Sequence, residues 1–201
     1  MQPNKFFIKR LFDICVSTIV LLLLSPFVLI VVLTIHLESS GSAFFSQARV
    51  GKDGQVFNMW KFRSMYIDAE KHKTKLSNDM AGGILFKMKK DPRITYMGKF
   101  IRKASIDEIP QFWNVLKGDM SLVGPRPALP HEVKQYNEYQ RQRLDVQPGI
   151  TCIWQVSGRS ELSFQQQVEM DLEYIAKQSF CLDIILLLKT IPAVLTGRGA
   201  Y

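Results

Sequence analysis

The chain has 201 residues and a formal net charge of +8, from 26 Lys and Arg against 18 Asp and Glu. This length predicts one domain besides any membrane segment. The positive charge suits anionic lipid headgroups and phosphate-bearing ligands, but with no DNA- or RNA-binding motif and no dense basic tract we expect no nucleic-acid partner. The 3 cysteines are widely spaced and form no C-x-x-C pair, so neither a disulfide framework nor a zinc site is indicated and a reducing compartment is expected.

The first expected element is an apolar helix. Ile14 to Leu37 carries no formal charge over about two dozen residues, enough for a helix of roughly 36 Å that could cross a bilayer core. Pro26 removes a backbone donor and clashes with the preceding turn, so a straight helix is not expected. Carbonyl groups freed in lipid need local partners, and the Ser25 hydroxyl is placed to help.

Positive charge flanks this segment on both sides, with Lys9 and Arg10 before it and Arg49 and Lys52 after it. Since basic flanks mark the cytoplasmic side, the pattern favours a re-entrant membrane helix-break-helix over residues 1–38. A cytoplasmic domain over residues 39–201 then follows. An ordinary span with a tolerated proline is the alternative. A cleaved signal peptide fits poorly because the apolar stretch is too long.

Residues 43–62 next predict a β-hairpin, because short apolar runs flank the turn signal Lys52-Asp53-Gly54-Gln55. A lysine-rich helix over residues 66–76, a loop at Gly82 and Gly83, and a turn at Asp91-Pro92 are expected after it.

Helical periodicity dominates the rest of the chain. Apolar stripes predict helices over residues 94–101 and 109–116, the second ending at Gly118. A Pro-Gly-rich segment, a helix over residues 131–144 and a loop over residues 147–161 follow. The next helix begins at Ser163 in a capping box, and residues 180–195 form a core or interfacial helix. The fold class predicted is mostly α with a small β-hairpin.

An acidic pair is the sharpest chemical feature. Ser105-Ile106-Asp107-Glu108 has the form of a capping box, which would begin a helix at Ser105. Pro110 favours a later start with Asp107 as the cap. Either register places Asp107 in a first helical turn, where the dipole favours a carboxylate and a bound phosphate. Two adjacent carboxylates could divide the roles of nucleophile and divalent-cation ligand.

A phosphate site also needs cations, and arginine suits phosphate because its planar fork binds two oxygens. The candidates are Lys61, Arg63, Arg102, Arg126 and Arg159. Each one alone also fits a solvated surface charge. The chain contains no Walker loop and no G-x-S-x-G elbow, so the residues themselves name no substrate.

Several motifs resemble the bacterial sugar transferase family, in its small monotopic phosphoglycosyl transferase form. They are Ser25-Pro26, Met59 to Met65, Arg102 to Gln111, Asn114 to Pro127, Pro148 to Thr151, Trp154 to Arg159, Met170 to Ile175 and Ser179 to Asp183. The motifs occur in the family's order and cover nearly the whole chain. One departure is Cys152, where the family usually has glycine, which puts the shape of that loop in question.

The resemblance implies an enzyme that transfers a sugar 1-phosphate from a UDP-sugar to polyprenyl (undecaprenyl) phosphate and releases UMP. Asp107 would be the nucleophile of a phosphosugar-aspartate intermediate, and Glu108, with Asp107, would hold Mg2+. Lys61, Arg102, Arg126 and Arg159 would contact phosphates, and Asp183 would be an active-site carboxylate of undefined role.

The same resemblance places the enzyme on the cytoplasmic face of the bacterial inner membrane, in contact with membrane lipid. It would start the assembly of exopolysaccharide, capsule, O-antigen or glycoprotein glycans. The segments 83–88 and 197–201 look like those of hexose-transferring members, which favours UDP-glucose or UDP-galactose. A homodimer is left open.

Two other functions remain alternatives at this stage. A membrane-bound hydrolase would use the same site to cleave sugar nucleotides with water. A non-catalytic tether would bind polyprenyl phosphate, although binding alone does not require a carboxylate nucleophile beside the phosphate.

Overall fold

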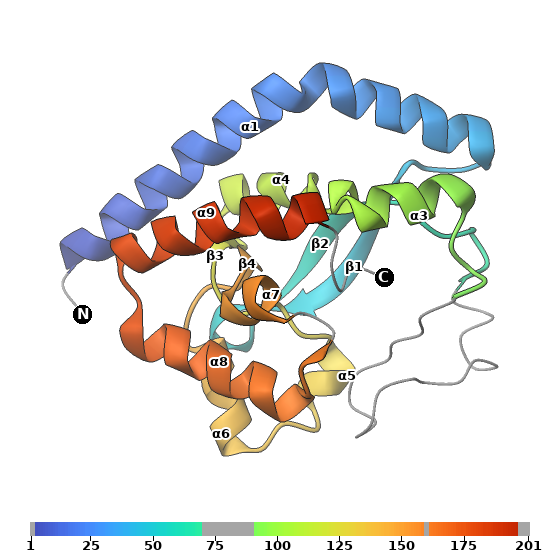
Figure 1. Cartoon of the computed structure of the whole chain (residues 1–201). Coiled ribbons are helices and arrows are strands. Elements are labelled where there is room, and N and C mark those ends of the chain that lie inside the picture. The colour runs from blue at the N-terminus through green and yellow to red at the C-terminus, as the bar shows by residue number, and fades with distance from the viewer. Residues whose placement is uncertain (1–2, 70–90, 159–160, 197–201) are drawn as a thin grey trace.

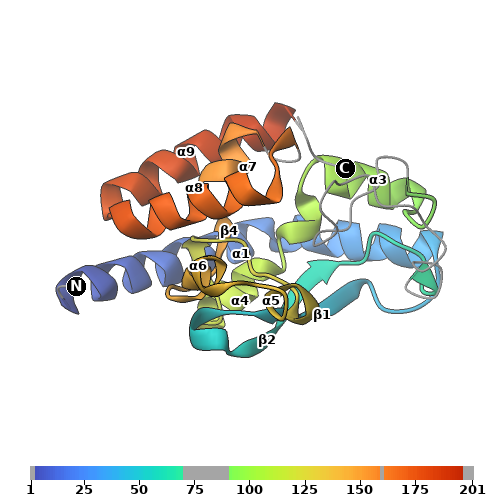
Figure 2. The same cartoon turned by 90° about the horizontal axis from the view of Figure 1, so that it is seen from below.

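The computed structural model describes residues 3–69, 91–158 and 161–196, and this part of the chain is mostly helical with two small sheets. In Figure 1 the long helix α1 (Pro3–Glu38) arches over α9 (Phe180–Thr196), α4 (Gln111–Lys117) and α3 (Tyr96–Lys103), and α8 (Phe164–Lys177) lies on the far side of the body. Figure 2, seen from below, shows α7 (Ile153–Ser157), α8 and α9 together as one layer.

Helix α1 remains helical through Pro26, although Figure 1 shows it bent into two arms. The helix-break-helix expected from the sequence is therefore one bent helix. Proline lacks the N–H that would reach the Leu22 carbonyl four residues earlier. The Ser25 hydroxyl donates to that carbonyl at 2.8 Å, as the sequence predicted. The serine thus satisfies the acceptor that the proline leaves free.

Both arms of α1 pack against the same domain. In the first arm, Arg10 donates to the Val115 and Leu116 carbonyls at 2.6 and 2.8 Å, near the end of α4. In the second arm, Val31 and Ile35 are buried with Phe62 and Ile101. The bend between them is exposed, as shown by Leu23 with 74% of its surface accessible.

The predicted hairpin is confirmed as β1 (Phe44–Val50) and β2 (Val56–Phe62), antiparallel with Val50 opposite Val56. The connecting turn, η1 (Lys52–Gly54), needs positive φ at Asp53 (54°) and Gly54 (76°). Asp and Gly adopt this left-handed region more readily than other residues, which explains why the local sequence revealed the turn.

A second sheet was not predicted. β3 (Ser121–Val123) pairs in parallel with β4 (Gly149–Thr151). The two strands approach so closely that a Cβ built on Gly149 would lie 2.0 Å from the Gly124 nitrogen. Strands of 3 residues are too short to show an alternating pattern.

The helices expected near residues 94–101 and 109–116 are confirmed as α3 and α4, and α4 ends at Gly118 with φ of 91°. The capping box at Ser163 is confirmed at the start of α8, where Gln166 N donates to Ser163 Oγ at 3.3 Å. The turn at Asp91-Pro92 is also confirmed, because Ile94 N donates to the Asp91 carbonyl at 3.3 Å.

The single helix predicted over residues 131–144 is wrong. The chain forms α5 (Pro130–Val133), α6 (Glu138–Arg141) and the 3-10 turn η4 (Gln142–Leu144). A reciprocal cap between Asn137 and Gln140 starts α6 as a new helix, so the first cannot continue through it. The loop expected over residues 147–161 likewise contains β4 and α7. Most of the lysine-rich segment 66–76 and the glycine loop at 82–83 lie outside the described residues.

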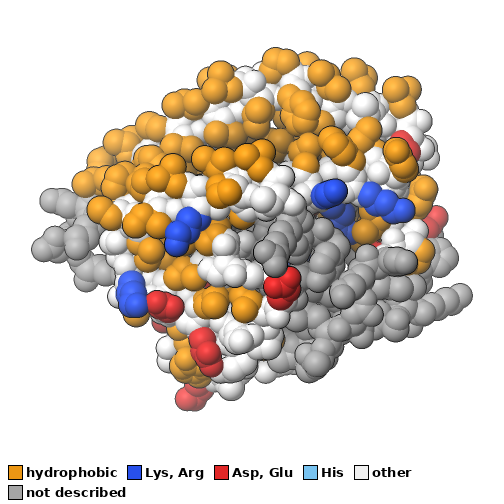
Figure 3. All heavy atoms as spheres, in the orientation of Figure 1, with side chains coloured by type: hydrophobic (Ala, Val, Ile, Leu, Met, Phe, Trp, Pro, Cys, Tyr) orange, Lys and Arg blue, Asp and Glu red, His pale blue; other side chains and the backbone are white. Residues whose placement is uncertain are grey.

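The main core joins the sheets to α4, α8 and α9. Its buried members are Met59, Val115, Met120, Leu122, Val123, Tyr174 and Leu186. The opposite face of α9 is apolar but accessible, and Figure 3 shows hydrophobic side chains gathered over α1 and α9 with charged side chains mainly below them. The body therefore has one apolar side.

Candidate active site

The acidic pair does not begin a helix. Ser105 has a φ of 55° and makes no side-chain cap, and residues Ile106–Glu108 form the separate 3-10 turn η3. Pro110 is the N-cap residue of α4. The two helix starts predicted from the sequence, with Ser105 or Asp107 as the cap, are therefore both wrong. The argument that the dipole of this helix favours the Asp107 carboxylate is wrong as well. Proline is compatible with a helix start because it has no N–H to satisfy there, and here the helix begins directly after it.

Lys61 supplies the positive charge that holds the pair. Lys61 lies on β2, which packs against η3. Its Nζ is 3.0 Å from Asp107 Oδ2 and 2.9 Å from Glu108 Oε1. Asp107 is 7% exposed, and burial raises the pKa of its carboxyl group while Lys61 lowers it. The lysine thus favours the ionised form that a nucleophile needs.

A cleft of about 730 Å³ opens at this pair, within the size range of small-molecule sites. Arg102 on α3 and Arg126 line it together with Lys61, Asp107 and Glu108. Arg126 Nη1 is 3.7 Å from Glu108 Oε1. Pro125 and Pro127 flank Arg126, and this loop leaves β3 where the two short strands meet. Arg63 also lines the cleft, although its guanidinium group donates to the Ser39 and Ser40 carbonyls at 2.7 Å. The structure therefore brings together five of the predicted side chains in addition to Asp107.

Asp183 is not among the described residues that line the cleft. It is 2% exposed, its Oδ2 lies 2.6 Å from Lys9 Nζ, and Tyr174 donates to its Oδ1 at 2.7 Å. It therefore joins α9 to α1 and α8, and its role as an active-site carboxylate stays a prediction. Ser25 and Pro26 lie at the bend of α1, and Arg159 falls outside the described residues.

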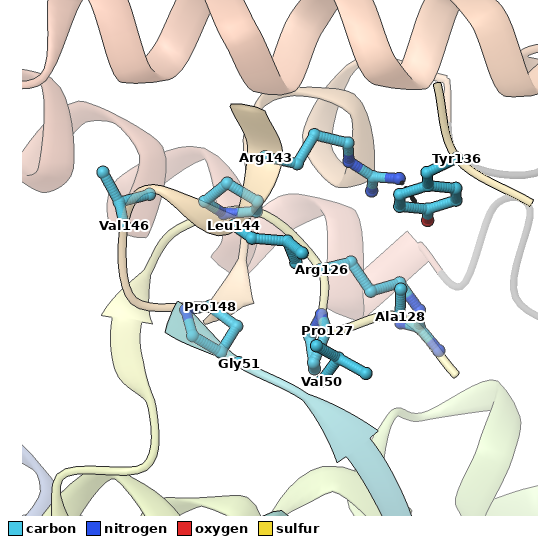
Figure 4. Close-up of a pocket in the computed structure, with 11 residues that line it drawn as sticks. Val50, Gly51, Arg126, Pro127, Ala128, Tyr136, Arg143, Leu144, Val146 and Pro148 are labelled. Atoms are coloured by element: carbon cyan, nitrogen blue, oxygen red, sulfur yellow. Dashed lines mark hydrogen bonds between the residues drawn. The ribbon is translucent and has the colours of Figure 1, made fainter. Parts of the chain in front are cut away.

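Three arginines that line the cleft were not singled out as site residues from the sequence, and one of them, Arg93, pairs with Asp91 at 2.7 Å. Arg143, in η4, forms a buried ion pair with Asp171 on α8 at 2.6 Å and donates to the Tyr136 hydroxyl at 2.9 Å. Figure 4 shows Arg143 extending to Tyr136, with Arg126 below them. Burial outweighs the attraction of Arg143 and raises the pKa of Asp171 to about 6. Nothing local marks Arg143, because it follows two other polar residues in a helical stretch.

Arg49, on β1, is the third such residue. Its Nη1 donates to the Pro127 carbonyl at 2.9 Å and its Nη2 donates to Gln47 Oε1 at 2.7 Å. From the sequence it was no more than a positive flank of the membrane segment. Its position in the cleft depends on the pairing of β1 with the loop after Arg126, which no local pattern predicts.

The donor set at the pair fits a magnesium ion. In the described ranges no group of three or more His, Cys, Asp and Glu side chains is arranged to hold a metal. Mg2+ however binds through one or two carboxylates together with substrate phosphates and water. Asp107 and Glu108 at the cleft supply that number of carboxylates.

A bent apolar helix and a helical domain with one apolar side are consistent with membrane association, and a lysine-bound carboxylate pair in a basic cleft suits phosphorylated substrates. The chain belongs to the bacterial sugar transferase family, whose profile matches residues 4–197. The resemblance inferred from the motifs is thereby confirmed.

Named relatives agree with this assignment. The chain is 48% identical over 194 residues to the galactosyl transferase CpsE of Streptococcus agalactiae, which covers 96% of the chain and 43% of the relative. It is 42% identical over 200 residues to the undecaprenyl-phosphate galactose phosphotransferase of Salmonella typhimurium, covering 97% and 42%. A UDP-N-acetylgalactosamine-undecaprenyl-phosphate N-acetylgalactosaminephosphotransferase of Aeromonas hydrophila is 42% identical over 205 residues, covering 99% and 46%. The chain thus spans less than half the length of these relatives.

Proposed function

We propose that this chain transfers a sugar 1-phosphate from a UDP-sugar to polyprenyl phosphate and releases UMP. The observation that carries the proposal is the Asp107–Glu108 pair on Lys61, at a basic cleft in a domain with an apolar side. The relatives' names add support, since two of them contain the words undecaprenyl-phosphate and phosphotransferase.

The reaction proceeds in two displacements at one phosphorus atom. A carboxylate oxygen of Asp107 attacks the β-phosphorus of the donor, and the bond from that phosphorus to the bridging oxygen breaks with UMP as the leaving group. An oxygen of the polyprenyl phosphate then attacks the same phosphorus and displaces Asp107. The product is a polyprenyl diphosphate sugar, and the aspartate is regenerated. A covalent intermediate divides one difficult transfer into two easier steps.

The surrounding cations stabilise the negative charge that develops on the phosphate oxygens during transfer. Lys61 keeps Asp107 ionised and positioned, and Arg102, Arg126 and Arg159 bind phosphate oxygens through their planar guanidinium groups. Glu108, with Asp107, would hold Mg2+, which when bound neutralises phosphate charge and orients the transferring group.

The two substrates meet at the cytoplasmic face of the membrane. The apolar bend of α1 enters the lipid and returns, which agrees with the packing of both its arms on one domain. A soluble sugar nucleotide then reaches the cleft from the cytoplasm while the lipid acceptor stays in the bilayer. A homodimer is not needed for this arrangement and stays a prediction.

For the donor we propose a UDP-hexose, glucose or galactose. This choice rests on the segments 83–88 and 197–201, which lie outside the described residues. Overall similarity does not decide the sugar, because a galactose and an N-acetylgalactosamine enzyme are each 42% identical to the chain.

The test is the intact mass of the full chain, embedded in lipid nanodiscs, after incubation with Mg2+ and UDP-galactose or UDP-glucose without acceptor. The wild-type protein should gain one hexose phosphate and release UMP. Asp107→Asn keeps the shape of the site but removes the nucleophile, so it should gain nothing and lose several orders of magnitude in turnover, as for lost nucleophiles elsewhere.

The exposed Asp145, which does not line the cleft, provides the control: Asp145→Asn should gain hexose phosphate like the wild type. A wild-type protein that turns over yet stays unmodified would instead indicate direct attack by the acceptor. UMP and free hexose phosphate formed without any acceptor would indicate a hydrolase, and no turnover with any donor would indicate a lipid-binding tether.

A further inference from the structure

Arg49 is a cation without a matching anion. Its guanidinium group has five N–H donors, and it donates to the Pro127 carbonyl and to Gln47 Oε1, both uncharged. Its Nε is buried and has no hydrogen-bond partner. Among the described residues no carboxylate lies within ion-pair distance of it. A largely buried positive charge without an ion-pair partner is unfavourable unless an anion binds beside it.

The neighbourhood of Arg49 carries an excess of positive charge. Of the described residues that line the cleft, seven are Lys or Arg and four are Asp or Glu. Three of these acids are already paired with Lys61 or Arg93. The fourth, Glu132, accepts from the Leu129 backbone N–H at 2.8 Å. Glu132 and Glu108 favour the charged form of Arg49, but burial and the charge of Arg126 outweigh them and lower its pKa.

Arg126 is the cation whose charge acts on Arg49, which makes it the partner for a shared anion. It precedes Pro127, whose carbonyl binds Arg49, and the repulsion from Arg126 adds to burial in lowering the pKa of Arg49 to about 10. Val50 N also donates to the Ala128 carbonyl at 2.9 Å, which fixes β1 against this loop. Two like charges held side by side by rigid backbone favour an anion that contacts both.

We propose that Arg49 is a phosphate-binding residue of the cleft, which acts with Arg126 on one phosphate group of a substrate. This inference rests on the proposed function for the identity of the substrate. The phosphate belongs either to the diphosphate of the nucleotide donor or to the lipid acceptor. In both cases the Pro127 carbonyl and Gln47 orient the guanidinium group, and each takes one N–H of Nη1 or Nη2 and leaves the second for the anion.

The experiment measures binding by calorimetry with the full chain in nanodiscs, using inorganic pyrophosphate, UDP and farnesyl phosphate as separate probes. Arg49→Gln keeps a hydrogen-bond donor but removes the charge, and should weaken pyrophosphate binding roughly tenfold to a hundredfold, the effect of one charge-assisted hydrogen bond. Arg49→Lys keeps the charge and should stay within a few-fold of wild type. Lys177→Gln, on the exposed side of α8 and paired only with Glu173, is the matched control and should bind as wild type.

The other two probes identify the source of the phosphate. A loss for UDP alone assigns Arg49 to the donor, and a loss for farnesyl phosphate alone assigns it to the acceptor. Unchanged pyrophosphate binding in Arg49→Gln would overturn the proposal. An equal loss in Arg49→Lys would also overturn it, because Arg49 would then only fix the loop, and this comparison remains valid if the Gln variant fails to fold. If pyrophosphate binding depends on Arg49 but neither UDP nor farnesyl phosphate binds, the proposed function fails while the anion site stands.

Discussion

At the scale of single residues, the candidate site depends on one lysine shared by two carboxylates. Lys61 Nζ lies at hydrogen-bond distance from both Asp107 and Glu108. Burial raises the pKa of Asp107, and the first effect that opposes it is the charge of Lys61. The fraction of Asp107 that is ionised at a given pH therefore depends on the balance between burial, which is the larger effect, and the charge of Lys61.

Lys61→Met is expected to shift the pH dependence of intermediate formation. Below its pKa Asp107 is protonated and cannot attack, so the rate falls as the pH falls through that pKa. Removing Lys61 raises the pKa further, because a neighbouring cation no longer favours the charged form, and the acidic limb of the profile should move to higher pH. The measurement is the rate of UMP release from donor alone as a function of pH.

Lys117→Met serves as the control for this profile, because Lys117 pairs with Asp119 outside the cleft. Lys61→Arg should keep the limb near its original pH. An unchanged limb in Lys61→Met would mean that Asp107 does not titrate in the rate-limiting step.

The site was predictable only where a residue carries a local signal. Asp107 and Glu108 stand in a distinctive motif, and Arg126 stands between two prolines. Arg49 enters the cleft through the pairing of Val50 with Ala128, and Arg143 is fixed by Asp171, which is 28 residues away in sequence. These contacts are long-range, so no spacing rule reveals them. Ser105 gave a false signal because Pro110 starts the helix later than the capping box implied.

At the scale of elements, those with a strong local code were predicted well. The hairpin turn and the cap at Ser163 are specified by neighbouring residues, whereas β3 and β4 form only because they meet each other. Helix α1 follows the same distinction. Its bend at Pro26 and the serine that relieves it are local, while the packing of both its arms on one body is tertiary.

The re-entrant topology can be tested by cysteine labelling. In a background with Cys15 and Cys181, the exposed cysteines, changed to serine, Asn4→Cys and Ser46→Cys should both resist a membrane-impermeant maleimide in intact cells. Both should react after permeabilisation, since both ends of α1 contact the same domain. Labelling of just one position in intact cells would show a spanning helix.

Pro26→Ala is the matched variant for this experiment. Alanine restores the N–H that reaches the Leu22 carbonyl, so the bend should lose its cause and a fraction of molecules should label at one end only. Ser25→Ala removes the hydroxyl but keeps the proline, and its labelling should stay closer to wild type.

At the scale of the whole molecule, the proposed function gives the apolar side and the cleft different tasks. Exposed apolar side chains on α9 include Leu188 and Leu195, 61% and 81% accessible, and Phe100 on α3 extends the surface at 62%. Side chains of this size gain about 1.5–3 kcal/mol each on full burial in an apolar medium. A surface that places them in lipid would hold the cleft against the membrane, where the acceptor resides.

We therefore expect acidic substitutions on α9 to affect transfer to the acceptor more than formation of the intermediate from the donor alone. Leu188→Glu combined with Ile191→Glu should reduce transfer to undecaprenyl phosphate in vesicles at least about tenfold, because the variant loses the free energy of burying two apolar side chains in lipid. Formation of the donor-only intermediate should stay near the wild-type rate, because Asp107 and the donor lie in the cleft.

Gln165→Glu combined with Lys177→Glu adds acidic charge to the exposed side of α8, away from the apolar surface, and should leave both half-reactions intact. An equal loss in both half-reactions of the α9 variant would show that these residues only stabilise the fold, and no loss in either would show that this surface does not meet the membrane.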